Sequence, residues 1–379
     1  MTIFELILVF YAVAFLSCGK ENPDPPEKDP HDDSSREDDF TAITQMLDDS
    51  SFMYLDRIYV EVFKDNQSIY KYQKGEINCS NIPLGQGSAT KWISAAVMLR
   101  LAEKGWWGLD DSIGAYLPVF TRYGKGHITL RQSYSMSSGM FNPDYSSQYH
   151  TDPSLTLAQS VDSIAKNVQM LFPAGTMIGY DGTMMHVWGR VAEVIDRVND
   201  NSRDWRSIAR EELLDLLDMD NTDYSYFYPD NPAVAGGIET TPCDYLKFLK
   251  MIANNGKYNG KTILQPASVD EMFKDQTNSA PVYYTYWPSN HPDFPNGLDT
   301  LRYTFGAWYL EKDASNNITG IASPGAFGHY PFVDRCRNLY GTFFCYIPYY
   351  EGGAKNVRNT FLHFMKILRN TIGPCNLNE

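Results

Sequence analysis

A single charged side chain lies in a long stretch of this 379-residue chain that is otherwise without charge. Between Ile77 and Leu99 the only charged residue is Lys91. Charged residues make up 21% of the sequence, so about five would be expected here from composition. Gly85 and Gly87 predict a turn early in the stretch. The residues that follow predict a helix that is apolar on nearly all sides, and such a helix must lie inside the protein with other segments packed around it.

This helix brings a serine and the lysine onto one face. Ser88 and Lys91 are three residues apart, a spacing at which helical side chains are neighbours. Burial disfavours the ammonium form, so we expect a neutral amine that can accept a proton from the Ser88 hydroxyl. A serine nucleophile needs such a base. The residues alone leave an alternative open, in which Ser88 caps the helix and Lys91 extends to solvent.

The spacing has little specificity by itself, because Ser-x-x-Lys also occurs at residues 17–20, 68–71 and 163–166. The first copy lies in the N-terminal export segment. The second lies in a predicted hairpin, where residues three apart point to opposite faces of a strand. The third lies in a polar, helix-like stretch, where a solvated lysine is the simpler interpretation. Only the pair at 88 and 91 combines a glycine turn, a helix start and an apolar setting.

The first 39 residues indicate export followed by a tether. Leu6 to Leu16 is apolar but too short to span a bilayer as a helix. It leads to Cys18 in a sequence that resembles a bacterial lipoprotein cleavage box. We therefore expect a signal peptide over residues 1–18, lipidation of Cys18 and a location in the bacterial cell envelope as a periplasmic or outer-membrane lipoprotein. Ordinary secretion or a core segment is the alternative. Residues 19–39 are rich in proline and acidic side chains, which predicts a disordered linker.

The net charge argues against two classes of binding partner, and the cysteine spacing argues against a metal site and a disulfide framework. The formal net charge is −14 and no Lys/Arg cluster is present, which argues against nucleic acid and against electrostatic binding to anionic lipid. We expect contact with a membrane only through the anchor at Cys18, and a monomer. The other five cysteines are scattered without a Cys-x-x-Cys, and the sequence therefore indicates neither a metal site nor a disulfide framework. They are Cys79, Cys243, Cys336, Cys345 and Cys375.

The order of predicted elements indicates an α/β (α+β) fold. A short helix at 41–47 and a hairpin at 57–74 precede a mostly helical middle, with helix-like stretches at 155–170, 183–197 and 207–217. Strands follow at 303–310, 326–333 and 339–347, and an amphipathic helix at 357–372 ends the domain. Strands at both ends predict one sheet built from both termini with an inserted helical subdomain. We place the domain at 40–375, the sheet subdomain at about 40–86 and 300–375, and the helical subdomain at about 87–299.

Several phrases, in order along the chain, resemble the serine beta-lactamase and penicillin-binding-protein superfamily. The similarity is strongest to the branch that holds class C beta-lactamases, D-alanyl-D-alanine carboxypeptidases and related esterases, and it runs from about residue 40 to 370. It implies a beta-lactamase/transpeptidase-like fold, with an antiparallel sheet flanked by helices, and a serine hydrolase without a cofactor or metal. The phrases are Gly-Ser-Ala-Thr-Lys (87–91), Leu-Asp-Asp-Ser-Ile (109–113), Met-Ser-Ser-Gly-Met (136–140), Phe-Pro-Ala-Gly-Thr (172–176) and Ala-Gly-Gly (235–237).

The resemblance also assigns residues to the second motif. Tyr180 matches the family's tyrosine, which a nearby ammonium such as that of Lys91 would help to ionise. Gly182 stands where the family has an asparagine that touches the substrate. Asp181 is expected to cap the helix that begins at Thr183.

The third motif, usually Lys-Thr-Gly, falls on Ser323-Pro324-Gly325, so its lysine is absent. The resemblance implies an oxyanion hole made by the backbone N–H groups of Ser88 and Ala326. Ser323, Gly325, Gly182 and His329 are the candidate substrate-binding residues. For His329, packing within the sheet is the alternative.

Together these features predict an exported serine hydrolase that works through a Ser88 acyl-enzyme on small acyl substrates, as an esterase or acyl-transfer enzyme. The alternatives are a beta-lactamase or D-alanyl-D-alanine carboxypeptidase, and a catalytically silent binding or sensor lipoprotein. A Ser-His-Asp hydrolase is less well supported, because no Gly-x-Ser-x-Gly occurs and His186 lies in an apolar helix. Asp218, Asp220 and Asp223 lack the glycine and glutamate of a calcium loop and predict a helix end and turn.

Overall fold

The computed structural model describes residues 39–141, 149–199, 201–285, 302–348 and 354–375. Contacts divide the chain into Met1–Asp38 and Asp39–Glu379, and the fold is that of the second unit. The predicted signal peptide, Cys18 and nearly all of the predicted linker lie outside the described residues. Within the described part, no helix is both long enough and apolar enough to cross a bilayer.

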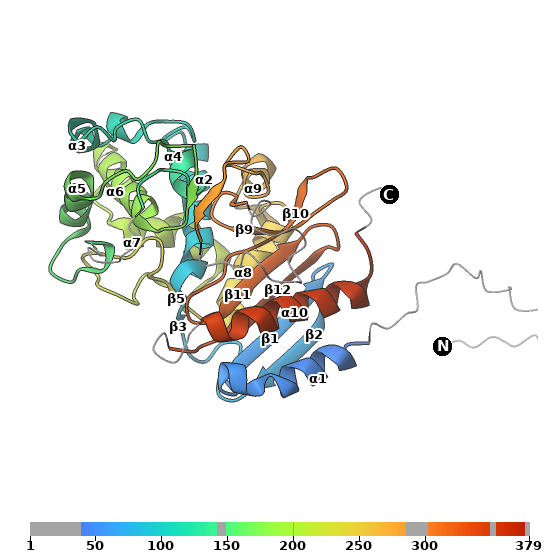
Figure 1. Cartoon of the computed structure of the whole chain (residues 1–379). Helices are drawn as coiled ribbons and strands as arrows, with labels where there is room; N and C mark the ends of the chain where they lie inside the picture. Colours follow the sequence, from blue (N-terminus) through green and yellow to red (C-terminus); the bar gives the residue numbers. More distant parts are fainter. Residues whose placement is uncertain (1–38, 142–148, 200, 286–301, 349–353, 376–379) are drawn as a thin grey trace, which may run out of the picture. The chain divides into compact units, whose positions relative to one another are not determined.

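An antiparallel sheet joins the two ends of the chain, as predicted (Figure 1). Every residue of its central strand β12 is buried, which requires cover on both faces. The register places Val60 opposite Phe343 and Tyr59 opposite Phe344, so aromatic and β-branched side chains pair across the strands. The order is β2 (Gln67–Lys74), β1 (Ile58–Lys64), β12 (Leu339–Cys345), β11 (His329–Asp334), β10 (Ile318–Ala322) and β9 (Trp308–Lys312).

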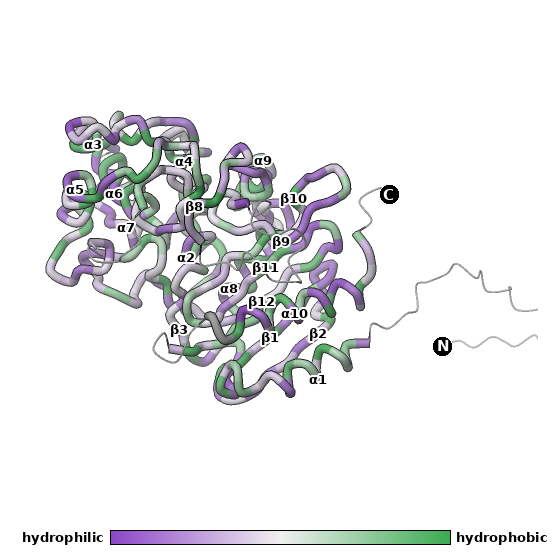
Figure 2. The backbone as a smooth tube through the Cα atoms, in the orientation of Figure 1, coloured by the Kyte–Doolittle hydropathy of each residue, from purple (hydrophilic) through white to green (hydrophobic). Residues whose placement is uncertain are grey.

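Helices cover both faces of this sheet. His329 and Tyr330 are neighbours in β11 and therefore point to opposite faces. The Tyr330 ring stacks on Phe361 of α10 (Ala354–Ile372), with ring centres 4.6 Å apart. The His329 ring contacts Tyr245 of α8 (Pro242–Ala253), also at 4.6 Å. Helix α1 (Thr41–Asp49) lies beside α10 (Figure 1), and hydrophilic and hydrophobic residues are mixed along both helices (Figure 2).

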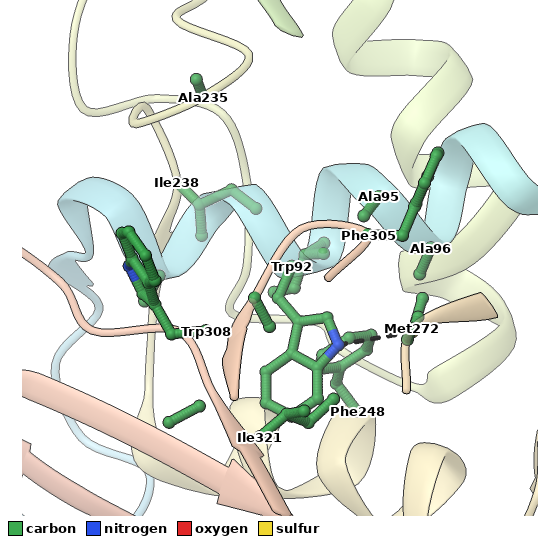
Figure 3. Packing of buried hydrophobic residues seen from close by; sticks show 14 of the residues in the cluster. Trp92, Ala95, Ala96, Ala235, Ile238, Phe248, Met272, Phe305, Trp308 and Ile321 are labelled. Atoms are coloured by element: carbon green, nitrogen blue, oxygen red, sulfur yellow. Dashed lines mark hydrogen bonds between the residues drawn. The ribbon is translucent and has the colours of Figure 1, made fainter. Parts of the chain in front are cut away.

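The apolar stretch forms α2 (Thr90–Glu103), which is buried from Thr90 to Leu99 as its composition predicts. Figure 3 shows Trp92, Ala95 and Ala96 of this helix among apolar side chains from other segments. The remaining helices are α3 (Pro118–Arg122), α4 (Leu130–Tyr134), α5 (Leu157–Asn167), α6 (Thr183–Val198), α7 (Trp205–Ala209) and α9 (Pro266–Glu271). Three short strand pairs and a 3-10 helix lie outside the main sheet. The pairs are β3 (Leu84–Gly85) with β5 (Glu239–Thr240), β4 (Ile178–Gly179) with β8 (Val282–Tyr284), and β6 (Lys257–Tyr258) with β7 (Lys261–Thr262), and the 3-10 helix is η2 (Gly87–Ala89).

The structure differs from the sequence predictions in several respects. The strand predicted over 303–310 is β9 (Trp308–Lys312), which begins five residues later. The helix predicted over 207–217 is α7 followed by a π-helical turn (Arg210–Leu214) and a 3-10 turn (Asp215–Leu217). Strand β10 was not predicted, since it is short and contains a glycine. The interpretation of the cysteines is wrong: Cys79 bonds to Cys243 and Cys336 to Cys375, while Cys345 is free and buried. The paired cysteines are 164 and 39 residues apart in sequence, so only the fold shows which of them meet.

Candidate active site

Ser88 lies in η2, immediately before α2. It does not cap this helix, because the N-cap position is Ala89 and no side-chain cap is present. Gly87 has a φ of +53°, in the region that favours glycine. A side chain on Gly87 would begin 2.9 Å from the backbone nitrogen of Ala326. Glycine therefore allows the nucleophile's backbone and the Ala326 backbone to approach closely.

Lys91 points at the serine from the next turn. Its Nζ donates to Ser88 Oγ at 3.0 Å and to the Ala235 carbonyl at 2.9 Å. The side chain does not extend to solvent, since Lys91 is only 5% exposed. Burial lowers the pKa of Lys91 to about 8, against the opposing charge of Asp181. About one-tenth of the amine is then neutral at pH 7. The alternative of a capping serine and a solvated lysine is excluded.

Tyr180 follows β4 and faces the same lysine. Its ring centre lies 5.2 Å from Lys91 Nζ, and its ring stacks on Trp308 at 5.1 Å. Its backbone nitrogen donates to the Tyr284 carbonyl at 3.0 Å, so strand β8 fixes its position. Burial raises the pKa of the phenol, whereas hydrogen bonding to Ser88 and Trp308 acts in the opposite direction. Because the pKa of Lys91 is lowered while that of Tyr180 is raised, Lys91 loses its proton first.

Gly182 leaves no room for the family's asparagine. A side chain at this position would begin 2.8 Å from the Ala235 side chain and 3.8 Å from Lys91 Nζ. Ala235 thus occupies the space beside the lysine where an amide would otherwise stand. Asp181 is not the N-cap of α6, which is Gly182, without a side-chain cap. The Asp181 Oδ1 instead accepts from the backbone N–H of Thr183, the first helical residue, at 2.5 Å and from the Thr183 hydroxyl at 2.7 Å.

The connection between β10 and β11 lies against the nucleophile. A side chain on Gly325 would overlap the Gln86 carbonyl, so glycine brings the two backbones into contact. The neighbouring Ala326 lies against Gly87, as the predicted oxyanion hole requires. Ser323 is 2% exposed, and its hydroxyl donates to the Ser88 carbonyl at 3.2 Å. This hydroxyl supports the nucleophile's backbone and does not face an open cleft.

His329 does not reach the site, which corrects its assignment as a substrate-binding candidate. The residue is 1% exposed. Its Nδ1 contacts the Gln86 side chain, and its Nε2 lies 2.7 Å from the Thr342 hydroxyl. Both ring nitrogens are therefore engaged inside the sheet subdomain, as in the strand-packing alternative.

Two features of the site were not found from sequence. One is the Ala235 carbonyl, which holds Lys91 although the Ala-Gly-Gly phrase gives no sign of this contact. The other is His150, in the 3-10 turn η4 (Tyr149–Thr151). The pKa of His150 is lowered by burial and by the charge of Lys91, while Asp181 raises it. Nothing in the local sequence of His150 distinguishes it from a loop histidine.

His186 packs beside this turn, as the core-histidine interpretation predicts. It is buried, its Nε2 lies 3.0 Å from the Ser160 hydroxyl, and its ring centre lies 6.0 Å from that of His150. Among the described residues, no three His, Cys, Asp or Glu side chains gather as metal ligands.

Comparison with known proteins agrees with this geometry. The family model described as Beta-lactamase matches residues 62–362, a span that includes Ser88, Lys91, Tyr180 and Ala326. This chain belongs to the Beta-lactamase family. Its sheet and flanking helices are the beta-lactamase/transpeptidase-like fold expected from the sequence. No curated protein matches the chain.

Solved structures of several named activities share the fold. A protein from Bacteroides dorei DSM 17855, named "putative beta-lactamase", has a TM-score of 0.71 and 27% identity over 82% of this chain and 91% of its own. EstCE1, described as a hydrolase with promiscuous acyltransferase activity, has a TM-score of 0.66 and 16% identity over 85% and 98%. A D-stereospecific amidohydrolase from Streptomyces sp. has a TM-score of 0.56 and 18% identity over 80% and 94%. The last two likenesses concern the fold alone.

Proposed function

We propose that this protein is an exported serine hydrolase that cleaves uncharged esters through an acyl-enzyme on Ser88. The observation that carries the proposal is the hydrogen bond from the buried Lys91 to the Ser88 hydroxyl at 3.0 Å. A neutral amine at this distance removes the hydroxyl proton as the serine oxygen attacks the ester carbonyl. The N–H groups of Ser88 and Ala326 stabilise the resulting oxyanion.

The proton then moves to the leaving group. When the tetrahedral intermediate collapses, the carbon–oxygen bond to the alcohol breaks and the alkoxide takes up the proton held by the Lys91 ammonium. This transfer is direct, or it passes through the Tyr180 phenol, which donates its own proton and receives the one from Lys91. Tyr180 is suited to donate because burial keeps it protonated. A water molecule, or an alcohol in acyl transfer, repeats the sequence on the Ser88 ester and restores the enzyme. The acyltransferase activity in the description of EstCE1 supports alcohol as a second acceptor.

Two observations favour an uncharged substrate over a beta-lactam or a D-alanyl peptide. Both of those substrates carry a carboxylate, and Ser323-Pro324-Gly325 supplies no cation to meet it. Arg335 is a poor replacement, because it pairs with Asp270 at 2.8 Å and stacks on Phe273. A silent binding protein is disfavoured because the contact from Lys91 to Ser88 is present.

The two disulfides support export, since such bonds persist mainly in oxidising compartments. Anchoring through a lipid on Cys18 is part of the proposal. Metabolic labelling with a fatty-acid analogue should mark the native protein and not Cys18→Ser.

The experiment that tests the function is labelling with a fluorophosphonate, which reacts with activated serines. We expect one adduct, on Ser88, and none in Ser88→Ala. Ser163→Ala is the matched control, because Ser163 also precedes a lysine by three residues on a helix, α5, and should label as the native protein does. A native, folded protein without a Ser88 adduct would support the silent-binder alternative.

A further inference from the structure

An aromatic wall borders the oxyanion-hole residue Ala326. It consists of Tyr226, Phe327 and Tyr346, which come from distant parts of the sequence. The ring centre of Phe327 lies 5.1 Å from that of Tyr226 and 5.5 Å from that of Tyr346. All three residues are partly exposed, so the wall presents ring surface that a ligand can contact.

The backbone fixes the wall next to the nucleophile. Phe327 directly follows Ala326, so their Cα atoms are about 3.8 Å apart. On the other side, Tyr226 covers Gly85, three residues before Ser88, so closely that any side chain at residue 85 would overlap the ring.

The wall also shares a scaffold with the catalytic lysine. The backbone N–H of Tyr226 donates to the Gly237 carbonyl at 3.1 Å. Gly237 is two residues beyond Ala235, whose carbonyl holds Lys91. The stretch that positions the base therefore also positions one ring of the wall.

Beyond Tyr346 the wall continues into a depression on the protein surface. Its apolar lining comes from Ile77, Ile82, Leu84 and Tyr346, and its polar lining from Arg57, Glu76 and Asn81. Ile82 is 46% exposed, so its side chain is accessible to a ligand. The disulfide at Cys79 ties this segment to the start of α8.

We propose that the aromatic wall and this depression bind the apolar part of the ester that is cleaved at Ser88. The preferred substrates then carry an alkyl or aryl group of several carbons on one side of the scissile bond. The occupant follows from position, because Phe327 directly follows Ala326, whose backbone lies against Gly87 next to Ser88. Each methylene that is fully buried there raises the specificity constant up to about fourfold. This inference rests on the proposed function.

The test compares chain lengths in two series. In the first, p-nitrophenyl acetate, butyrate and octanoate vary the acyl group. In the second, acetates of ethanol, butanol and octanol vary the alcohol. We expect kcat/KM to rise at least tenfold from the shortest to the longest member of one series, and the series that responds identifies the side of the ester in contact with the wall. No rise in either series would overturn the inference.

Variants of Phe327 assign the effect to the wall. Phe327→Ala should lower the ratio of kcat/KM for the longest to the shortest ester about tenfold, and Phe327→Leu should keep most of it. Tyr123→Ala is the matched control, because this ring is 40% exposed at the end of α3 and should leave the ratio unchanged. An unchanged ratio in both Phe327 variants, with Tm values near that of the native protein, would overturn the inference.

Labelling of Ser88 distinguishes a failure of this inference from a failure of the proposed function. If the native protein takes up the fluorophosphonate on Ser88 and cleaves acetates without a preference for length, only the role of the wall is wrong. If Ser88 does not label, the proposed function and the inference fall together.

Discussion

At the scale of single residues, we expect Lys91 to determine how the proposed reaction depends on pH. Its pKa is lowered to about 8 because the ammonium is buried. The neutral amine is the base, so the base is mostly protonated below this pH and mostly neutral above it. Lys91 also explains why the candidate nucleophile could be predicted from the sequence. A lone lysine in an otherwise uncharged stretch is seldom needed for structure, and helical spacing identifies Ser88 as its neighbour.

We therefore predict that kcat/KM for p-nitrophenyl acetate rises with pH and levels off above about pH 8. Lys91→Ala and Tyr180→Phe should each lower turnover by roughly a hundredfold or more, which is typical of the loss of a general base or acid. Measurement of pH–rate profiles for the three proteins checks this. A profile that falls between pH 7 and 9 would contradict the assignment of Lys91 as the base. Near-native activity of Tyr180→Phe would show that another group carries the second proton.

At the scale of elements, we expect the connection between β10 and β11 to determine which substrates the proposed enzyme accepts. It supplies Ser323, whose hydroxyl is committed to the Ser88 carbonyl, where the family has a lysine. A charge-assisted hydrogen bond to a carboxylate contributes about 1.5–3 kcal/mol. Its absence corresponds to about a ten- to more than a hundredfold lower rate for anionic substrates, whereas an uncharged ester is unaffected.

The expected outcome is that p-nitrophenyl acetate and butyrate have higher specificity constants than nitrocefin. Both reactions release a chromophore, so one enzyme preparation serves for both. Faster hydrolysis of nitrocefin would mean that another cation holds the carboxylate. In that case Arg335 would have to leave its pairing with Asp270.

Elements with a strong period were predictable, and those shaped by tertiary contacts were not. Alternation over 57–63 and the turn residues at 65–67 predicted the β1–β2 hairpin within 57–74, and apolar spacing predicted α6 and α10. The π-helical turn at Arg210–Leu214 breaks a helix whose sequence is continuous in period. The surroundings of His329 could not be predicted, because strand periodicity shows which residues share a face but not what that face contacts. In the structure the His329 ring contacts Gln86 and Thr342 and not the site.

At the scale of the whole molecule, one of the two disulfides links the sheet part to the helical part, and the other lies within the sheet part. Cys79–Cys243 closes a loop of 164 residues and ties the segment before β3 to α8, whereas Cys336–Cys375 closes 39 residues around β12 and α10. One end of the longer loop, at Cys79, lies shortly before β3, which leads to Ser88. The scattered cysteines gave no sign of this, because pairing depends on distance in space.

A disulfide that closes a longer loop restricts the unfolded chain more, so the two bonds should differ in effect. On the chain-entropy model, loss of either lowers the free energy of unfolding by about 2–5 kcal/mol, and the longer loop contributes about 1 kcal/mol more than the shorter. Urea unfolding of Cys79→Ser/Cys243→Ser and of Cys336→Ser/Cys375→Ser measures the two contributions. Cys345→Ser is the control, because Cys345 forms no disulfide. Cys345 is buried, so this substitution measures the effect of changed packing and not the loss of a cross-link. Equal stability of the native protein with and without reductant would contradict the prediction. A larger loss from the shorter loop would show that strain or residual structure outweighs loop entropy.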